Sequence, residues 1–465
     1  MRLLHVVHDF LPRYQAGSEI YALALGRELA RRHHVTILCA DFDPARAHGE
    51  VIWRLQDGLP VVEVVNNWLC GSFEDTYRSP VIGDRLRHVL RAVQPDVVHV
   101  HNLLNLSFEL PALARAAGIP VVATLHDYTL VCASGGQRIH RAEQHVCREI
   151  DLDRCARCFS ESPFSARMSL GLVAAAPAPV RSLAGAMRRR FPRLTDRLAD
   201  AAPRPAGITG SDMARRLSAA RDAWQQIDLF VAPSASIAGE FERLGVSPSR
   251  IRVSDYGFPA CALQATDLRS PSFGGQAGDP RVRIGFAGSL VWHKGAHVLL
   301  EAIRELPANS YDVTIFGDPG VSPSYARDLL IVASGFPVRF AGAFERRRMA
   351  DAYRAIDVLV VPSLWLENSP LVIHEAYQLQ RPVIGSRIGG ITELVKDGWN
   401  GLLFDPGSAS GLAAALRRVI ERPGILQEFA ERLPTVKSIA EDCLEWEARY
   451  AEVLNGRSAT GLHDR

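Results

Sequence analysis

The stretch DVLVVPSLWLENSPLVIHEAYQLQ, residues 357–380, runs from a β-branched strand pattern through a polar loop into a helical pattern. Ser369 has the side chain of a helix N-cap, and Pro370 suits the first helical position. This places Glu367 in the loop and Glu375 in the second helical turn. A strand that leads through a short loop into a helix is half of a βαβ unit, so the stretch predicts a parallel sheet.

The same alternation of short apolar runs and amphipathic runs occurs in both halves of the chain. After residue 280 the strand patterns are 283–289, 312–318, 338–344 and 382–386, with a helical pattern at 294–306. Before residue 130 the strand patterns are 3–10, 34–40, 96–102 and 120–126, with a helical pattern at 18–32. The sequence therefore predicts two α/β domains with Rossmann-like parallel sheets.

Composition and spacing set the expected domain limits. We expect an N-terminal domain over 1–263, with a helical and cysteine-rich insertion at about 132–225. Residues 264–281 are rich in Gly, Ser, Pro and Asp without periodicity, which is typical of a linker. The C-terminal domain is then 282–440, followed by a closing helix and tail at 441–465.

The composition of the 465 residues excludes several classes of protein. Lys and Arg number 53 against 51 Asp and Glu, so there is no basic excess of the kind that binds nucleic acid. The N-terminus lacks the long apolar run of a signal peptide, and the apolar run 170–180 is too short to span a bilayer. We therefore expect a cytoplasmic protein.

Three strand-to-loop junctions in the second half carry residues suited to a phosphorylated ligand. One presents Lys294 shortly after Gly288, and another opens a helix with Gly389 and Gly390, whose amides suit an anion. The third carries Glu367 and Glu375, whose carboxylates suit sugar hydroxyls. Each feature also has an ordinary interpretation as a solvated lysine, a plain turn or a first-turn glutamate.

The second half strongly resembles family 4 of the retaining GT-B glycosyltransferases, and the resemblance extends more weakly over most of the chain. Its signature is Glu-x7-Glu, here Glu367 to Glu375 within PSLWLENSPLVIHEA, followed by GSRIGGITELVKDGWNGLLF. The resemblance implies that Glu375 holds the donor ribose, Glu367 the transferred sugar and Lys294 the diphosphate. It also implies two facing Rossmann-like domains and no catalytic metal ion.

The resemblance implies further donor-site residues. The amides of Gly389 and Gly390 are expected at the phosphate or sugar, and Asn368, Ser369 and Pro370 shape the loop between the glutamates. The donor base is expected near Gly317 and Phe344. Ser289, which follows Gly288, stands where the family often has an arginine, so the diphosphate has one cation fewer unless another arginine reaches it.

Two loops of the N-terminal half match the family in part. Gly17 belongs to the loop that opens the first helix, but Ala16 replaces the first glycine of the family's pair. His126 matches the histidine that faces the donor sugar at a strand end, and it is our catalytic candidate together with Glu367 and Lys294. The alternative for His126 is a hydrogen-bonded core histidine; His101 ranks below it.

By the same resemblance, the reaction moves a hexose-type sugar from a nucleotide diphosphate sugar to a glycan, a lipid-linked acceptor or another envelope acceptor. The leaving diphosphate helps to deprotonate the acceptor hydroxyl, so no protein nucleophile is required. A non-catalytic nucleotide-sugar-binding or scaffold protein is the main alternative. A dinucleotide-dependent oxidoreductase would want G-x-G-x-x-G at the first strand-to-helix turn, which the chain lacks.

Four cysteines lie close together in the expected insertion: Cys132, Cys147, Cys155 and Cys158. The last two have the C-x2-C spacing of a zinc knuckle, so structural zinc is one prediction, with His140 and His145 as substitute ligands. Reduced thiols and two disulfides are the alternatives. Nearby, residues 181–198 mix arginines with Leu, Met and Phe, which fits either peripheral membrane contact or a solvated helix.

Overall fold

The computed structural model describes residues 1–13, 16–43, 45–165, 167–168, 177, 179–180, 183, 186–187, 190–191, 194, 207–259, 281–344 and 348–460. The chain divides into two compact units. Unit 1 comprises Met1–Pro233, Ala238–Gly257 and Ile439–Arg465, and unit 2 comprises Ser234–Ile237 and Phe258–Ser438. Residues 264–280 of the expected linker, and most of the basic stretch 181–198, lie outside the described residues.

Unit 1 is built on an eight-stranded sheet in the order β10-β9-β6-β5-β1-β2-β4-β3. Its strands are β1 (Arg2–Val6), β2 (His34–Asp41), β3 (Val51–Gln56), β4 (Leu59–Val65), β5 (Val97–Val100), β6 (Val121–Thr124), β9 (Leu229–Ala232) and β10 (Ile251–Val253). All neighbours pair in parallel except β3 and β4, which form an antiparallel pair. The central strands are buried along their whole length, as expected when helices cover both faces of a parallel sheet.

Two helices of this part of the chain begin at residues that favour helix starts. Thr209 and Asp212 form a reciprocal capping box at the start of α8, and Ser79 caps α2 ahead of Pro80. The helices are α1 (Gly17–Leu29), α2 (Pro80–Val93), α3 (Leu110–Ala116), α4 (Leu152–Glu161), α8 (Gly210–Gln225), α9 (Ala235–Arg243) and α17 (Ile439–Thr460), with short 3-10 turns η1 (Glu74–Thr76) and η2 (Pro248–Arg250). A small hairpin, β7 (Ile139–His140) and β8 (His145–Val146), precedes α4.

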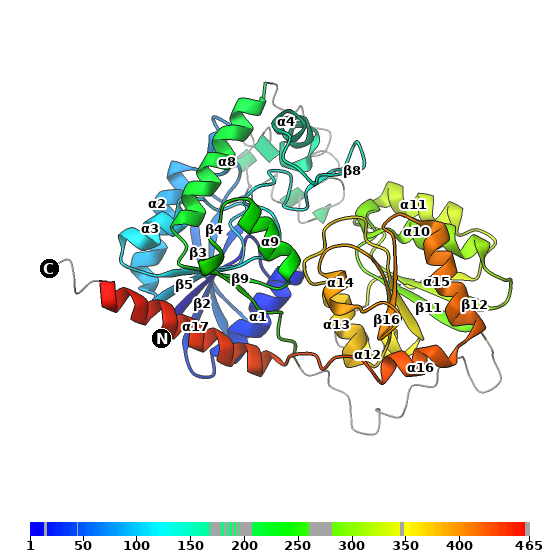
Figure 1. The fold of residues 1–465 in the computed structure, drawn as a ribbon. Coiled ribbons are helices and arrows are strands. Elements are labelled where there is room, and N and C mark those ends of the chain that lie inside the picture. The colour runs from blue at the N-terminus through cyan, green and yellow to red at the C-terminus, as the bar shows by residue number, and fades with distance from the viewer. Residues whose placement is uncertain are drawn as a thin grey trace. The chain divides into compact units, whose positions relative to one another are not determined.

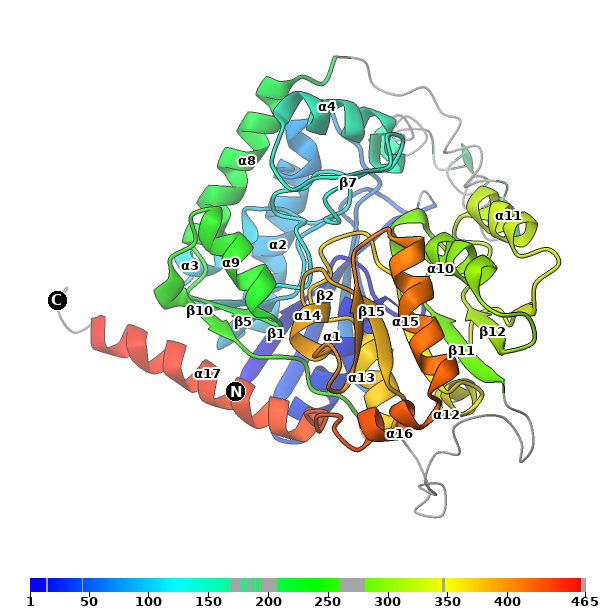
Figure 2. The same cartoon turned by 45° about the vertical axis from the view of Figure 1, so that its right-hand side comes forward.

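The C-terminal helix α17 belongs to unit 1, although it follows unit 2 in the chain. It lies beside α1 in both views (Figure 1 and Figure 2). The Tyr21 hydroxyl of α1 donates to Asp442 at 2.7 Å and accepts from the Trp446 indole at 2.9 Å. Because all three side chains are buried, these bonds fix α17 on unit 1.

Unit 2 has a six-stranded parallel sheet in the order β13-β12-β11-β14-β15-β16. Its strands are β11 (Val282–Ala287), β12 (Tyr311–Phe316), β13 (Val338–Phe340), β14 (Val358–Val361), β15 (Val383–Ser386) and β16 (Gly401–Phe404). Its helices are α10 (Ala296–Ala302), α11 (Pro323–Val332), α12 (Met349–Arg354), α13 (Leu371–Gln378), α14 (Ile391–Leu394), α15 (Ala409–Glu421) and α16 (Gly424–Ala430), with 3-10 turns η4 (Trp292–Lys294) and η5 (Ile303–Glu305).

Strand β14 shows why this sheet is covered on both faces. Val358 and Val360 belong to the core made with α10, α11, α15 and α16, whereas Leu359 and Val361 belong to the core made with α12, α13 and α14. Alternate residues of a strand point to opposite faces, so a continuous apolar run builds two cores. Figure 1 shows α10 and α15 on one side of the sheet and α12 to α14 on the other.

Both sheets reverse their strand order at one place. In unit 1 the reversal lies between β1 and β5, and in unit 2 it lies between β11 and β14. Open α/β sheets bind ligands at the carboxyl ends of the strands at such a switch point. The prediction of two α/β parts with parallel sheets is confirmed. Among the helices of the described residues, none is both long and apolar enough to cross a membrane.

Candidate functional site

The loops at the switch point of unit 2 pack against one another through glycines. Gly295 ends the turn after β11 with φ 74°, and a Cβ there would overlap the carbonyl oxygen of Pro362, at the end of β14. A Cβ on Gly317, after β12, would lie 2.5 Å from the Gly288 carbonyl oxygen. Three strand ends are thus held together by backbone contacts that only glycine permits.

Lys294 and Glu367 meet at this switch point. The Lys294 Nζ lies 2.6 Å from Glu367 Oε1, which also accepts a hydrogen bond from Ser363 Oγ at 2.7 Å. Glu367 is 4% exposed, so its charge depends on these two partners. The ammonium group also lies 5.1 Å from the ring centroid of Trp365. The sequence analysis did not predict that Ser363 and Trp365 belong to this site.

Trp365 has a feature of its own. It is buried, and its indole Nε1 has no hydrogen-bond partner among the residues that the structure describes. A buried donor without a partner is uncommon in native proteins. It lies beside the Lys294–Glu367 pair, where a bound ligand would offer an oxygen.

Gly389 and Gly390 lie directly against the loop that carries Glu367. Gly390 donates its N–H to the Glu367 carbonyl oxygen at 2.7 Å, and Gly389 has φ 53°. A Cβ on Gly390 would overlap the carbonyl oxygen of Asn368. The glycine pair therefore shapes the loop. Because the Gly390 amide already has this partner, the role of an anion-binding amide stays a prediction for Gly389.

Glu375 lies on α13, one turn after the loop. Its Oε2 accepts a hydrogen bond from the Tyr353 hydroxyl of α12 at 2.9 Å. Helix α13 has Pro370 as its N-cap, so the prediction of Ser369 as the cap was wrong by one residue. Ser369 Oγ instead lies 2.8 Å from His374 Nε2.

The remaining predicted donor-site residues surround the same strand ends. Phe344 packs edge to face on Phe316 and Tyr353, with centroid distances of 5.5 and 6.1 Å. Ser289 follows Gly288 and is exposed, and Asn368 is buried next to Glu367. The structure therefore brings the predicted residues of unit 2 to one edge of one sheet.

In unit 1, His126 follows β6 at the same edge as the switch point. Its Nδ1 lies 2.9 Å from the Tyr256 hydroxyl and its Nε2 lies 3.0 Å from His101 Nδ1. Burial lowers the pKa of His126 to about 3. The imidazole is therefore neutral near pH 7, and both of its ring nitrogens have protein partners. Gly17, the other predicted residue of unit 1, is the first residue of α1, and Ala16 is its N-cap.

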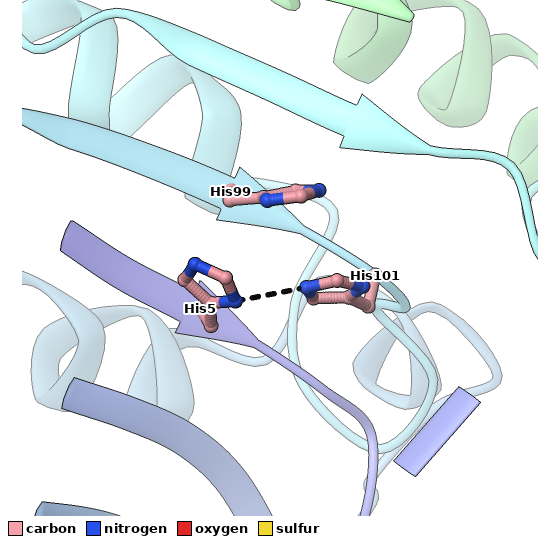
Figure 3. Close-up of side chains that lie close together, drawn as sticks. All are labelled: His5, His99 and His101. Atoms are coloured by element: carbon pink, nitrogen blue, oxygen red, sulfur yellow. Dashed lines mark hydrogen bonds between the residues drawn. The ribbon is translucent and has the colours of Figure 1, made fainter. Parts of the chain in front are cut away.

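His101 connects His126 to a buried group of histidines. His5 on β1 and His99 on β5 lie beside His101 (Figure 3). His101 Nε2 is 3.1 Å from His5 Nδ1, and His99 is hydrogen-bonded to the Tyr450 hydroxyl at 2.7 Å and to Thr124 Oγ1 at 2.8 Å. The Tyr450 hydroxyl is also 3.4 Å from His5 Nε2.

These three histidines have the spacing of a metal site, since one ligand atom of each lies within 4.8 Å of the others. Burial lowers the pKa of His5 to about 3 and holds those of His99 and His101 well below the usual range. All six ring nitrogens have the protein partners just described. A chain of neutral, mutually hydrogen-bonded imidazoles therefore accounts for the group without a metal ion.

The four clustered cysteines line one small cavity of about 30 Å³. Burial, and then the neighbouring thiols, raise the pKa of Cys155 to about 12. Burial raises the pKa of Cys158 to about 11, although a hydrogen bond with Ser134 opposes that shift. In the described part of the chain the histidine group is the sole set of three or more ligands within 4.8 Å of one another. In a tetrahedral zinc site, thiolates 2.3 Å from the zinc ion lie about 3.8 Å from one another. The four sulfur atoms line the same cavity, but they are not in such an arrangement.

The expected substitute ligands have other partners. The His140 nitrogens lie 3.2 Å from Glu143 and 2.8 Å from Glu161, and His145 Nε2 lies 3.0 Å from Arg154. All four cysteines of the cluster are free thiols here. Neither histidine is therefore directed to the cysteine cavity, and the alternative of two disulfides is not formed in this structure.

Family models match both halves of the chain. Residues 281–422 match the model described as glycosyl transferases group 1, and residues 16–183 match the model described as glycosyltransferase family 4. The first range contains Lys294, Glu367, Glu375 and the glycine pair. The second contains Gly17 and His126.

Curated relatives match part of the chain. A D-inositol 3-phosphate glycosyltransferase from Rhodococcus opacus is 33% identical over 41% of this chain and 44% of its own length. A sulfoquinovosyl transferase from Arabidopsis thaliana is 26% identical over 50% of this chain and 45% of its own length. The chain thus spans about half the length of the curated relatives it matches.

Solved structures match nearly the whole chain at low identity. HepE from Anabaena, solved in complex with UDP-glucose, is 17% identical, with a TM-score of 0.55 and 98% of each chain covered. The starch synthase IV catalytic domain from Arabidopsis thaliana, bound to ADP and acarbose, is 15% identical, with a TM-score of 0.60, 97% of this chain and 99% of that chain covered. These matches support the GT-B fold. With a family model on each unit, the chain belongs to family 4 of the GT-B glycosyltransferases.

Proposed function

We propose that this protein is a retaining glycosyltransferase that moves a hexose-type sugar from a nucleotide diphosphate sugar to an acceptor hydroxyl. The observation that carries the proposal is the pairing of Lys294 with Glu367 at the switch point of unit 2. A surface lysine would not be placed at 2.6 Å from a carboxylate that is 4% exposed. The pair combines a cation that can bind phosphate with a carboxylate that can accept hydrogen bonds from sugar hydroxyls. Both groups lie at the strand ends where α/β sheets bind ligands.

The proposed roles follow from the chemistry of each group. The Lys294 ammonium leaves Glu367 for the diphosphate and stabilises the charge that develops on it as the sugar departs. The Glu367 carboxylate, still held by Ser363, then accepts hydrogen bonds from hydroxyls of the sugar. The indole N–H of Trp365 supplies a further donor at the same place.

Glu375 is proposed to hold the ribose. The Tyr353 hydroxyl that donates to its Oε2 helps to fix the carboxylate on α13, and a carboxylate held in this way can accept hydrogen bonds from a pair of ribose hydroxyls. Gly389 is proposed to approach the phosphate or sugar with its amide. The nucleotide base is proposed to lie between Gly317 and Phe344, where backbone and ring surfaces select it.

In retaining transfer the new bond forms on the sugar face that the diphosphate leaves. The acceptor proton passes to the leaving diphosphate, so neither a protein nucleophile nor a catalytic metal ion is needed. The protein contributes positioning and stabilisation of an oxocarbenium-like state. The proposed acceptors are a glycan, a lipid-linked saccharide or another envelope glycoconjugate.

The test begins with thermal shift measurements of the purified protein with UDP-, GDP-, ADP- and TDP-sugars, because a ligand that binds only the folded state raises Tm. Turnover of the sugar that binds best is then followed by release of the nucleotide. The anomeric configuration of the product, read by NMR, decides between retention and inversion. A product of inverted configuration would contradict the retaining mechanism.

The alternative is a scaffold that binds nucleotide sugars without turning them over. A scaffold and an enzyme would both show the thermal shift, but only an enzyme would release nucleotide and sugar. Glu367→Gln separates them further, because it should reduce turnover in the enzyme and leave nucleotide binding nearly unchanged. Tight binding without turnover of any sugar tested would favour the scaffold.

Two further proposals concern the cysteine-rich segment and the basic stretch. We propose that the four cysteines, which line one cavity, close on a structural Zn²⁺ that would bind all four thiolates. Peripheral membrane contact through 181–198 is a separate proposal, which sedimentation with anionic vesicles tests.

A further inference from the structure

His8 and Glu19 form a pair at the carboxyl end of β1, the strand beside the switch point of unit 1. His8 follows β1 by two residues, and Glu19 is the third residue of α1. The His8 Nδ1 lies 3.2 Å from Glu19 Oε1. The His8 side chain is 22% exposed, whereas the Glu19 side chain is fully buried. A solvent-facing imidazole is therefore backed by a buried carboxylate.

Glu19 has few other partners. Its Oε1 accepts a hydrogen bond from Ser18 Oγ at 2.9 Å, and its buried Oε2 has no partner among the described residues. A buried carboxylate at the start of a helix gains from the helix dipole, but its remaining charge favours a cationic or N–H donor. The nearest nitrogen is His8 Nδ1, which lies 3.2 Å from Glu19 Oε1 but has no hydrogen bond among the described residues. With Nδ1 against Glu19, the Nε2 side of the ring is left for a ligand.

His8 differs from the other histidines at this edge of the sheet. Both ring nitrogens of His126 are engaged by Tyr256 and His101. In contrast, no residue that the structure describes forms a hydrogen bond with Nε2 of His8. A histidine whose inner nitrogen lies against a carboxylate, and whose outer nitrogen is open, is placed to form a hydrogen bond with a substrate hydroxyl.

The surroundings of His8 indicate the kind of ligand. Asp127, at the end of β6, accepts from Asn102 and from the backbone of Thr129 and interacts electrostatically with His8 and Glu19. Burial raises the pKa of Asp127, and it raises that of Asp9, next to His8, to about 8. The carboxyl groups beside this imidazole suit hydroxyl groups and disfavour a phosphate.

We propose that His8, oriented by Glu19, binds a hydroxyl group of a neutral, polyhydroxylated acceptor through Nε2. The proposal rests on the proposed function and adds to it the class of acceptor and a residue that contacts it. During transfer the hydroxyl oxygen bonds to the anomeric carbon of the donor, while the bond from that carbon to phosphate oxygen breaks with its electron pair. The hydroxyl proton passes to the leaving diphosphate, so His8 holds and orients the hydroxyl.

The experiment compares the wild-type protein with His8→Phe, which keeps a ring without nitrogens, and with His88→Asn as a control on the exposed side of α2. The donor is the nucleotide sugar that the wild type hydrolyses fastest. The acceptor probes are methyl glucoside and glucose 6-phosphate, each followed by mass spectrometry of the transfer product. We expect the wild type to prefer methyl glucoside by tenfold or more.

In His8→Phe we expect transfer to methyl glucoside to fall at least tenfold, while donor hydrolysis and the nucleotide-induced rise in Tm stay within twofold of the wild type. The His88→Asn variant should match the wild type in every assay. Undiminished transfer by His8→Phe, or a wild-type preference for glucose 6-phosphate, would overturn the inference. Absence of both nucleotide binding and hydrolysis in the wild type would instead contradict the proposed function.

A second measurement follows binding and needs no turnover. In ¹⁵N NMR of the wild type with bound nucleotide, methyl glucoside should shift the side-chain Nε2 signal of His8. In Glu19→Leu that shift should be lost, while the signals of His126 keep their positions. A His8 Nε2 signal that does not move at saturating methyl glucoside in the wild type would overturn the proposal.

Discussion

Gly390 donates its backbone N–H to the carbonyl oxygen of Glu367 at 2.7 Å, so the loop with the glycine pair holds the loop that carries the first glutamate of the signature. The same glycine leaves no room for a side chain, since a Cβ would overlap the carbonyl oxygen of Asn368. The glycine pair that looks like an anion-binding turn in the sequence therefore also determines where Glu367 lies.

The first prediction is that Gly390→Ala displaces the Glu367 loop. The backbone of Asn368 cannot move aside without breaking the hydrogen bond from residue 390, so we expect a loss of about 2 kcal/mol or more in the free energy of unfolding. Nucleotide-sugar binding should weaken with it. Gly424→Ala is the matched control in the same unit, because a Cβ there meets no atom within 4 Å. Equal denaturant midpoints for the two variants would contradict the steric argument.

The sequence predicted much of this site because its residues follow strand ends. Lys294, the two glutamates Glu367 and Glu375, and Gly389 come after three different strands, and a parallel sheet brings its carboxyl ends to one edge whatever the loops do. What the sequence did not predict are contacts between loops. The bond from Gly390 to Glu367 and the salt bridge from Lys294 to Glu367 depend on how loops distant in the chain pack, which no periodicity encodes.

The pair His8 and Glu19 shows a second limit. Glu19 looks like an ordinary first-turn glutamate in the sequence, and its burial depends on the sheet beneath α1. Similarly, Ser369 is a residue type that favours the N-cap position, but the N-cap of α13 is the next residue, Pro370. The Ser369 hydroxyl is hydrogen-bonded to His374 instead. Local chemistry predicted that a helix starts there, while tertiary packing decided which partner each side chain takes.

The second prediction concerns the Lys294–Glu367 salt bridge. Lys294→Met should destabilise the protein, because it leaves a carboxylate that is 4% exposed without its cation. Glu367→Gln removes that charge, so the double variant should recover part of the loss. With Lys294 28% exposed, we expect a coupling free energy of about 1–2 kcal/mol from urea unfolding of the four proteins. Additive effects of the two substitutions would show that the pair is not coupled.

The third prediction is a fall in stability below neutral pH that the histidine group causes. His5 has its pKa lowered to about 3 by burial, so it stays neutral in the folded protein while it protonates in the unfolded chain below pH about 6.5. The unfolded state then binds more protons, and stability falls as the pH decreases from about 6.5 towards 3. Each such histidine contributes about 1.4 kcal/mol per pH unit in this window.

The measurement is the free energy of unfolding of the wild type and of His5→Gln at pH 5, 6 and 7. The variant loses one such histidine and should show a slope between pH 5 and 6 that is shallower by about 1.4 kcal/mol per unit. His34→Gln serves as the control, because His34 is exposed. Parallel pH profiles for wild type and His5→Gln would contradict the assignment of the pH dependence to His5.

The fourth prediction concerns zinc in the cysteine segment. If the four cysteines bind Zn²⁺, protein purified without added metal should contain about one zinc per chain, and Cys155→Ser with Cys158→Ser should abolish it. A chelator should then lower Tm in the wild type and leave the double variant unchanged. Cys443→Ser is the control, because Cys443 lies on α17. Wild-type protein that contains no metal and has free thiols would support the alternative of reduced cysteines.

The fifth prediction tests the role of Glu375 through its partner. Tyr353→Phe removes the hydroxyl that donates to Glu375 Oε2 at 2.9 Å and keeps the ring that packs on Phe344. Without that bond the carboxylate is held less firmly, so we expect nucleotide affinity to fall about threefold to tenfold, as loss of one hydrogen bond of about 1 kcal/mol implies. Tyr311→Phe is the matched control. It also removes a buried tyrosine hydroxyl, which donates to the Ile303 carbonyl. Because this control lies away from Glu375, it should lower the Tm without changing the Kd for the nucleotide. An unchanged Kd in Tyr353→Phe would mean that Glu375 is placed by its helix alone.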